Sequence, residues 1–489
     1  MKRLYSRIAA LALVLAIGGC VPSLEDNPPR QPRTGLPPSF GRLGGPATAK
    51  SDAATTWAQL FSDPHLRHLI EMALDSNQEL QVRLQEIIIA KYEVMSRKGE
   101  YLPKVDAGVH GGVEKVGKYT SQGQADEHTD TPENLPDLGF GFSATWEVDI
   151  WGKLRNAAKA ANYRYLATIE GRKFAVTRLV AEIARSYFEL LALDKQLEVI
   201  EKNLEIQKNA LEVVRIQKQA ARVTQLAVQR FEAEVLKNQS LQYDLQQQIV
   251  QTENRLNFLV GRFPKHILRD ADRFDDPLPP PLKAGLPSAL LENRPDVRQA
   301  ELQLEAAKLD VAVAKARFYP SFSIDAEVGY EAFNPAHIVD TPDSLLYNLA
   351  GNLTAPLLNR AGIEAQYYAA NAMQLQAVYD YERTILSAFT EVKNQLTLTE
   401  NLEKSYELQK RQVEQLTDAI EVSNLLFRSA RADYMEVLLT RRDALESEME
   451  LIETKKRQLL AMVNIYQALG GGWRGRKTAR SDQPKPPEK

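Results

Sequence analysis

The stretch LGFGFSATWEVDIWGKLRN, from Leu138 to Asn156, decides the fold. From Leu138 to Val148 every second residue is apolar, and the residues between them are Gly, Ser, Thr and Glu. A period of two is typical of a β-strand with one apolar and one polar side. The pattern then ends at Trp151-Gly152, and helical sequence follows. The stretch therefore predicts a strand that passes directly into a helix at Gly152.

Three more stretches alternate in the same way, at about 104–114, 321–331 and 345–356. Strands of about nine to eleven residues can cross a bilayer when tilted. An open sheet edge in lipid leaves backbone groups unpaired, so membrane strands must close into a barrel, and the smallest barrels have about eight strands. Four strands per chain therefore predict an oligomer that shares one barrel. Three copies give twelve strands and a water-filled lumen, whereas two give eight strands around an interior that side chains tend to fill. The alternative is a soluble pair of hairpins buried on one face, which alternates identically.

Long helices account for most of the remaining chain. Apolar residues spaced three and four apart from Leu190 to Val214 form a coiled-coil seam. A continuous helix from Gly152 to a turn near Arg222 would be about 105 Å long, more than a compact domain needs. Helical periodicity starts after Asp63, a residue suited to the N-cap. The predicted fold class is mainly α with a membrane β-barrel portion, in which long coiled-coil helices form an α-barrel beneath a twelve-stranded trimeric β-barrel.

The two halves of the chain repeat each other. Ala220–Val228 corresponds to Ser429–Val437, 209 positions later, and Gly152 corresponds to Gly362. A proline-rich segment between the halves cannot form a helix or a paired strand and is interpreted as a linker. The predicted divisions are repeat 1 at 57–274, the linker at 275–287, repeat 2 at 288–473 with a tip near Arg431, and a disordered tail at 474–489.

The N-terminus predicts export. Lys2, Arg3 and Arg7 precede a short apolar run and then Gly-Gly-Cys20, which is typical of a bacterial signal peptide over residues 1–19. The apolar run is about half the length of a spanning helix. Ile-Gly-Gly-Cys resembles a lipobox, which implies an acylated Cys20, and Val21 rather than aspartate implies export to the outer membrane. The alternative is an incidental cysteine. Residues 20–56 predict an extended tether rather than a packed element.

Four segments follow one another along the chain: Trp57–Leu80, Trp146–Asn156, Asn293–Glu301 and Tyr466–Trp473. Together they resemble the TolC-like outer-membrane efflux proteins, in the lipoprotein branch that works with RND pumps. The resemblance covers nearly the whole chain after the signal peptide. It implies a homotrimeric exit duct in the outer membrane, with a periplasmic adaptor (membrane fusion) protein and an inner-membrane RND pump as partners, passively exporting small molecules such as drugs. Alternatives are a duct of type I protein secretion and a lipid-anchored periplasmic coiled-coil scaffold.

Candidate functional residues follow from this resemblance. In the family the helix-to-helix turns meet the adaptor and form the resting constriction, which assigns five residues to the periplasmic tip: Arg222, Thr224, Arg431, Asp433 and Tyr434. The glycine usual at these turns is replaced by Ala221 and Ala430. A ring of three Asp433 carboxylates would narrow the pore and favour cations; the alternative is simple helix capping. Gly152 and Gly362 are the strand-to-helix junctions.

Other polar and aromatic residues of the strands have expected positions. Asp106, Glu147, Asp325 and Glu327 lie on polar strand faces and are expected to face water in the lumen. Trp146 and Trp151 suit an interfacial aromatic belt or packing against a neighbouring helix.

Nothing in the sequence predicts catalysis. The formal net charge is −3, with no basic stripe of the kind that binds nucleic acid. The six histidines have no metal-ligand spacing, and there is no phosphate-binding loop or nucleophile elbow. We therefore expect no enzyme activity, no cofactor, no metal site and no nucleic-acid partner.

Overall fold

The computed structural model describes residues 21–24, 27–41, 51–129, 131–280, 282–429 and 431–474. The signal peptide, Cys20, Ala430 and the tail after Arg474 lie outside these residues. The chain forms two compact units. Both repeats contribute to each unit, so the units do not follow the predicted repeat boundaries. Unit 1 comprises Met1–Pro32, Ile87–Thr168 and Ala300–Tyr381, and unit 2 comprises Arg33–Glu86, Ile169–Gln299 and Glu382–Lys489.

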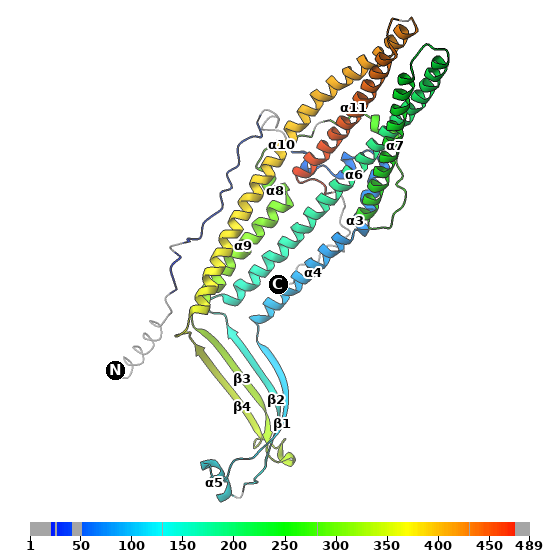
Figure 1. Cartoon of the computed structure of the whole chain (residues 1–489). Coiled ribbons are helices and arrows are strands. Elements are labelled where there is room, and N and C mark those ends of the chain that lie inside the picture. Colours follow the sequence, from blue (N-terminus) through cyan, green and yellow to red (C-terminus); the bar gives the residue numbers. More distant parts are fainter. Residues whose placement is uncertain are drawn as a thin grey trace. The chain divides into compact units, whose positions relative to one another are not determined.

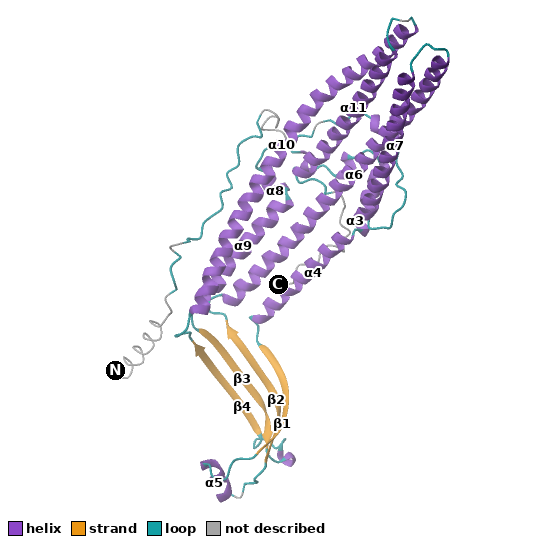
Figure 2. Ribbon diagram, in the orientation of Figure 1, coloured by secondary structure: helices purple, strands orange, loops and turns teal. Residues whose placement is uncertain are grey.

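Unit 1 contains one antiparallel sheet with the strands in sequence order (Figures 1 and 2). β2 begins at Leu135, three residues before the alternation predicts, because Leu135 and Pro136 still pair with Glu114 and Val113. β1 and β4 are the outer strands of the sheet. The strands are β1 (Lys104–Glu114), β2 (Leu135–Val148), β3 (Ser321–Ala332) and β4 (Leu345–Thr354).

Each strand joins a long helix. α4 (Gln78–Glu100) precedes β1, β2 leads into α6 (Lys153–Gln219), α9 (Pro295–Ala316) precedes β3, and β4 leads into α10 (Ala361–Arg428). Because the strands lie in the order β1-β2-β3-β4, the parts of α4 and α10 within unit 1 are at the two ends of its helical layer (Figure 1). α6 is one continuous helix of 67 residues, as the sequence predicts, and the division between the two units falls within it, after Thr168. A membrane-crossing length of apolar helix is absent from the described ranges.

Unit 2 is helical. Its helices include α3 (Pro64–Ser76), α7 (Gln225–Val260), α8 (Ala289–Asn293) and α11 (Tyr434–Ala468), with short helices η1 (Asp52–Ala54), α2 (Trp57–Leu60) and η2 (Ala271–Asp275). Asp63 caps α3, as predicted, because its Oδ1 accepts the N–H of His65 at 2.7 Å. The predicted seam on α6 is also confirmed, since Leu190 and Ile200 are fully buried in the core of unit 2.

The N-terminal segment is extended but packed, so the prediction that it is not a packed element is wrong. In unit 1, Val21 and Leu24 pack against a cluster that contains Phe318. In unit 2, Phe40 is 4% exposed and stacks on Phe389 with ring centroids 5.2 Å apart. The prolines between these residues lack an N–H to satisfy, and the isolated apolar side chains supply the contacts.

Candidate functional site

The register of the sheet separates polar from apolar side chains. Asp106, Ser143, Glu327 and Asn348 share one row across the four strands. Asp325 lies on the same face, two residues before Glu327 on β3, and accepts the amide N–H of Asn352 at 2.6 Å. The expected grouping of these carboxylates on one face is therefore confirmed.

Most of the charges of this face are acidic, and Lys104 at the start of β1 is a basic exception. Glu147 pairs with Lys153 at 2.5 Å, with β2 carrying the carboxylate and α6 the amine. Within the part of the chain that the structure describes, Asp106, Glu327 and Glu331 take part in no ion pair. A hydrophilic strand face with unpaired carboxylates is suited to water rather than to a packed core.

The opposite face is apolar and uncovered within unit 1. One row aligns Val109, Phe140, Tyr330 and Leu345, and the rings of Phe140 and Tyr330 stack at 5.6 Å. Val109 is 88% exposed, and Leu349 on the same face is 76% exposed. A soluble pair of hairpins would bury this face, whereas contact with lipid would leave it open in a single chain. The exposed face therefore favours the membrane interpretation.

Three glycines cross the polar face in one row: Gly108, Gly141 and Gly329. A Cβ added to Gly141 would lie 2.6 Å from the carbonyl oxygen of Val328, and one added to Gly329 would lie 2.5 Å from that of Phe140. Side chains cannot occupy these positions while the strands keep this approach. The row therefore permits a local bend of the sheet, the kind of curvature that barrel closure requires.

At the first strand-to-helix junction Gly152 has φ +71°, a left-handed conformation that favours glycine. This turn brings Asp149 over the start of α6, where it accepts the N–H groups of Leu154 at 3.0 Å and Arg155 at 2.9 Å. Burial raises the pKa of Asp149, but these hydrogen bonds and the Arg155 charge outweigh it and lower the pKa. The sequence interpretation missed Asp149, although an aspartate just before a predicted helix is a capping signal.

The second junction differs. Gly362 is the second residue of α10 and has open space around its Cα. The left-handed residue is Asn359, with φ +52°. Asparagine tolerates this conformation better than most residues. At this junction the left-handed turn therefore lies three residues before the predicted Gly362.

The two tryptophans at the first junction are hydrogen-bonded. Trp146 Nε1 donates to the carbonyl of Tyr101 at 3.1 Å, and Trp151 Nε1 donates to that of Pro320 at 2.8 Å. Trp151 also stacks on Tyr319 at 4.8 Å while remaining 48% exposed. Both rings thus pack against neighbouring junction residues, and Trp151 still presents a face outward.

The first helix-to-helix turn joins α6 to α7. The chain reverses through Ala221 at φ +57°, and the N–H of Arg222 bonds the carbonyl of Gln217 at 2.9 Å. Thr224 then caps α7, its Oγ1 accepting the N–H of Ala227 at 3.4 Å. Alanine at the position of the family glycine therefore keeps the left-handed turn, at a cost in backbone strain.

The second turn joins α10 to α11 in a matching way, with the N–H of Arg431 bonded to the carbonyl of Leu426 at 2.9 Å. Asp433 occupies the N-cap position of α11 but makes no side-chain capping bond. Of the described residues, none forms an ion pair with Arg222, Arg431 or Asp433. The simple capping role for Asp433 is therefore not what the structure shows.

The two hairpins meet near their turns at a shared apolar cluster in unit 2. The ring of Tyr434 lies 6.5 Å from that of Phe231, and Arg230 Nη1 contacts Met435 Sδ at 3.2 Å. Leu438 of α11 is buried in the same cluster as Phe231. The structure thus brings Tyr434 to the first hairpin and leaves the charged tip residues exposed beside it.

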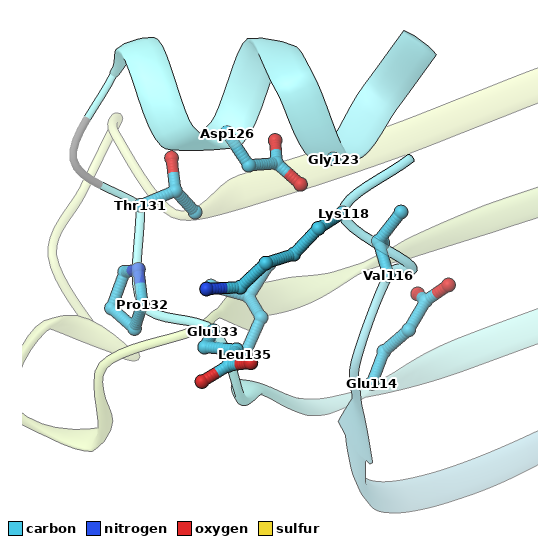
Figure 3. Close-up of a pocket in the computed structure, with 9 residues that line it drawn as sticks. All are labelled: Glu114, Val116, Lys118, Gly123, Asp126, Thr131, Pro132, Glu133 and Leu135. Atoms are coloured by element: carbon cyan, nitrogen blue, oxygen red, sulfur yellow. The ribbon is translucent and has the colours of Figure 1, made fainter. Parts of the chain in front are cut away.

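The loop between β1 and β2 holds the helix α5 (Ser121–His128), which alternation alone did not predict. The loop encloses a cavity of about 200 Å³ across which Lys118 extends toward Glu133 (Figure 3). A hydrogen bond and the charge of Lys115, with the charge of Lys118, lower the pKa of Glu133. The cavity is therefore lined by charged side chains of its own loop, and its Glu133 is paired with Lys115 at 2.7 Å. A cluster of three or more potential metal ligands is absent from the described residues.

Comparison with known proteins identifies the family. The sequence pattern of the outer membrane efflux proteins matches residues 69–262 and 286–471. The pyoverdine export outer membrane protein OpmQ of Pseudomonas putida is 28% identical over 97% of this chain and 99% of its own. The cation efflux system protein CusC of Escherichia coli is 25% identical over 96% and 99%.

Solved structures share the fold. A membrane protein from Pseudomonas aeruginosa superposes with a TM-score of 0.82 at 23% identity, over 92% of this chain and 100% of its own. The open state of the Neisseria gonorrhoeae MtrE outer membrane channel superposes with a TM-score of 0.78 at 23% identity, over 93% and 99%. With a family match over most of its length, the chain belongs to the outer membrane efflux protein family.

Proposed function

We propose that three copies of this chain form the outer-membrane exit duct of a tripartite RND-type efflux pump. The observation that carries the proposal is the register of the sheet, with carboxylates on one face and exposed apolar side chains on the other. The duct is passive and performs no chemistry. Solute passes along the polar face while lipid contacts the apolar face.

The unpaired edges of β1 and β4 require further strands. In lipid each unpaired backbone group costs several kcal/mol, so the edges of one copy must pair with those of others. Twelve strands from three copies enclose a lumen wide enough for water, and the bend at the glycine row supports closure.

The helices beside the sheet support side-by-side association. Within unit 1, α4 exposes Ile89 and Met95, 67% and 66% exposed, at one end of the layer. α10 exposes Met373 and Tyr379, 64% and 61% exposed, at the other end. Exposed apolar side chains on the two outermost helices suit contact between neighbouring copies, which would continue the barrel into a helical tube.

The tip residues are proposed to gate the duct and to meet the adaptor. Arg222, Thr224, Arg431 and Asp433 lie at the turns, and Tyr434 joins the hairpins beside them. Charged side chains on exposed turns that form no ion pair with the described residues can pair with opposite charges of a partner protein. Three Asp433 carboxylates around the axis would narrow the resting pore and favour cations.

The repeat divisions and the N-terminal anchor belong to the same proposal. Each repeat supplies two strands and one helical hairpin, divided by the linker at 275–287. Acylation of Cys20 would hold the N-terminus in the membrane. Val21 packs near Phe318, which lies between α9 and β3, so the anchor would sit at the level of the strand-to-helix junctions. Gly152 stands at the turn of the first junction, and Gly362 lies at the start of α10 in the second.

The cargo is proposed to be small molecules such as drugs. The printed functions of the relatives cover pyoverdine, cations and toluene, which differ widely in charge and size. Such a range on one fold fits an unselective conduit. Deleting the gene and testing a panel of antibiotics, dyes, metals and solvents would identify the cargo through the resulting increase in sensitivity.

Reconstitution in a planar bilayer tests the duct directly. The purified protein should give discrete conductance steps, and Asp433→Ala should raise the conductance by relaxing the tip. Thr440→Ala serves as the control, because it changes a residue of α11 near the tip to which no gate role is assigned. A folded protein that conducts in neither form would overturn the pore proposal and favour a scaffold.

A further inference from the structure

The same helix junction occurs twice in unit 2, once in each repeat. Gly261 follows α7 and Gly470 lies just after α11, 209 positions later, and both are left-handed, with φ +81° and +84°. A Cβ added to Gly261 would lie 2.5 Å from the oxygen of Ser76, the last residue of α3. A Cβ added to Gly470 would lie 2.5 Å from the oxygen of Asn293, the last residue of α8. The two junctions therefore correspond in structure as well as in sequence.

The second junction is covered by α6 of the same chain. A Cβ added to Gly472 would lie 3.2 Å from the Cα of Thr177, so the two backbones are in close approach. Nearby, Arg185 Nη1 donates to Asn464 Oδ1 at 2.9 Å and to Gln467 Oε1 at 2.8 Å. A helix of the first repeat thus closes the junction of the second repeat.

The first junction is open. A groove of about 570 Å³ lies beside Gly261 and is lined in part by Phe258 and Phe263. The two rings are 76% and 92% exposed. They correspond to Gln467 and Gly472, 209 positions later. The open junction therefore carries large aromatic side chains where the closed one carries an amide and a glycine, and exposed aromatic side chains around a groove are typical of a surface that a partner covers.

The helix that corresponds to α6 in the second repeat is α10. On it Leu386 corresponds to Thr177 and is 67% exposed. Since Leu386 and Phe263 are both exposed, α10 does not cover the first junction of its own chain. One turn further on, Phe389 stacks on Phe40, so the N-terminal segment would border any contact made at Leu386.

We propose that α10 of a neighbouring copy docks in this groove, with Leu386 against Phe258 and Phe263. The contact repeats between copies the one that α6 makes within a chain. Each copy offers an open junction and an uncovered face of α10, so the contact is head-to-tail and can close into a ring. The inference rests on the proposed trimer and names the surfaces that join its copies in unit 2.

A polar pair beside the leucine supports this docking. Arg185 and Asn464, which bond within the chain, correspond to Asn394 and Arg255. The arginine and the asparagine have thus exchanged helices, and the pair is retained. Arg255 bonds Glu182 through Nη2 at 3.1 Å, and a guanidinium has further N–H groups for a second acceptor. The docked helix would bring Asn394 Oδ1 to Arg255.

Exchanging the two residues tests the pair. Asn394→Arg places two arginines against each other and should lower the association constant about tenfold at each interface. Adding Arg255→Asn should restore association, because the pair then has the arrangement of Arg185 and Asn464. Analytical ultracentrifugation in detergent measures both variants. A double variant that associates as weakly as Asn394→Arg would overturn the inference.

A charge at Leu386 tests the apolar part of the contact. Leu386→Asp should lower the trimer fraction, because it places a carboxylate against Phe258 and Phe263. Ser387→Asp is the matched control, since it adds the same charge at an exposed position one residue away. Ser387 corresponds to Arg178, which bonds Glu79 of its own repeat at 2.6 Å, so it lies on another face of the helix. Equal trimer fractions for the two variants would contradict the docking.

Cross-linking separates failure of this contact from failure of the proposed duct. Arg255→Cys combined with Asn394→Cys, treated with a short bis-thiol cross-linker, should give covalent dimers and trimers on a denaturing gel, whereas neither single variant should. A trimeric protein without these products would overturn the contact and leave the duct in place. Cross-linked trimers that give no conductance would support the contact and contradict the duct.

Discussion

Replacing Gly141 with alanine tests whether the glycine row bends the sheet into a barrel wall. The added Cβ would lie 2.6 Å from the Val328 oxygen and 2.7 Å from the Gly329 Cα. Ordinary contacts begin at 3.4 Å, so the strands must separate locally by about 0.8 Å. Both obstructing atoms belong to the backbone, so rotating a side chain cannot relieve the clash.

The energetic cost of this clash is repeated in every copy of the assembled protein. Overpacking of this kind costs about 1–3 kcal/mol in each chain, or about 3–9 kcal/mol in the proposed trimer. Flattening the row also opposes the bend that lets twelve strands close. We therefore expect Gly141→Ala to lower the yield of trimer that resists dissociation in detergent, and to lower its thermal midpoint.

Gly108→Ala is the matched control because it lies in the same row with no atom within 4 Å of the added Cβ. It should assemble like the wild type. Analytical ultracentrifugation and gel migration without heating measure the trimer fraction for both variants. Equal trimer yields for Gly141→Ala and Gly108→Ala would refute the reasoning about curvature.

Three further predictions concern the helices. Ala221→Gly relieves about 1 kcal/mol of strain at this left-handed residue. Glycine also gives the unfolded chain more conformational freedom, which offsets part of that gain. Hydrogen exchange at the first turn should therefore slow by up to about fivefold. Burial and the hydrogen bond to Asp63 raise the pKa of Tyr187 above its unfolded value of about 10. The folded state then holds the proton longer, so stability is intact below about pH 10 and falls above it. Tyr187→Phe should reduce the slope of alkaline unfolding by about 1.4 kcal/mol per pH unit per chain. Arg294, 7% exposed, pairs with Asp296 at 2.7 Å and Glu391 at 2.8 Å. Arg294→Met should cost about 3–5 kcal/mol in denaturant unfolding, because two carboxylates lose a buried partner; an unchanged midpoint would contradict this.

The strands and long helices could be predicted because their patterns survive without tertiary information. Alternation from Leu138 to Val148 identified β2, and the seam on α6 identified a helix of full length. Pro136 interrupts the alternation, so the first residues of β2 were missed although they pair with β1. α5 was missed because its eight residues, six of them polar, carry no apolar period.

The site residues were harder to predict because their roles depend on geometry. The correspondence between repeats placed a junction glycine at Gly362, but the left-handed turn is at Asn359. Asp433 was placed at a turn, yet whether it caps α11 depends on the direction of its side chain. Phe40 stands close to several proline and glycine residues in the sequence, and only its ring contact with Phe389 shows that this segment is packed.

The packed N-terminal segment has a consequence for the order of folding. Asn27 bonds Asn371 344 positions away, and Arg33 bonds Glu382 349 positions away. A chain exported from its N-terminus exposes this segment long before its partners emerge, and contacts so distant in sequence form late. The segment must therefore wait undocked until α10 is complete. The proposed acyl group on Cys20 would hold that waiting end at the membrane, so the segment would close over α10 as one of the last steps of maturation.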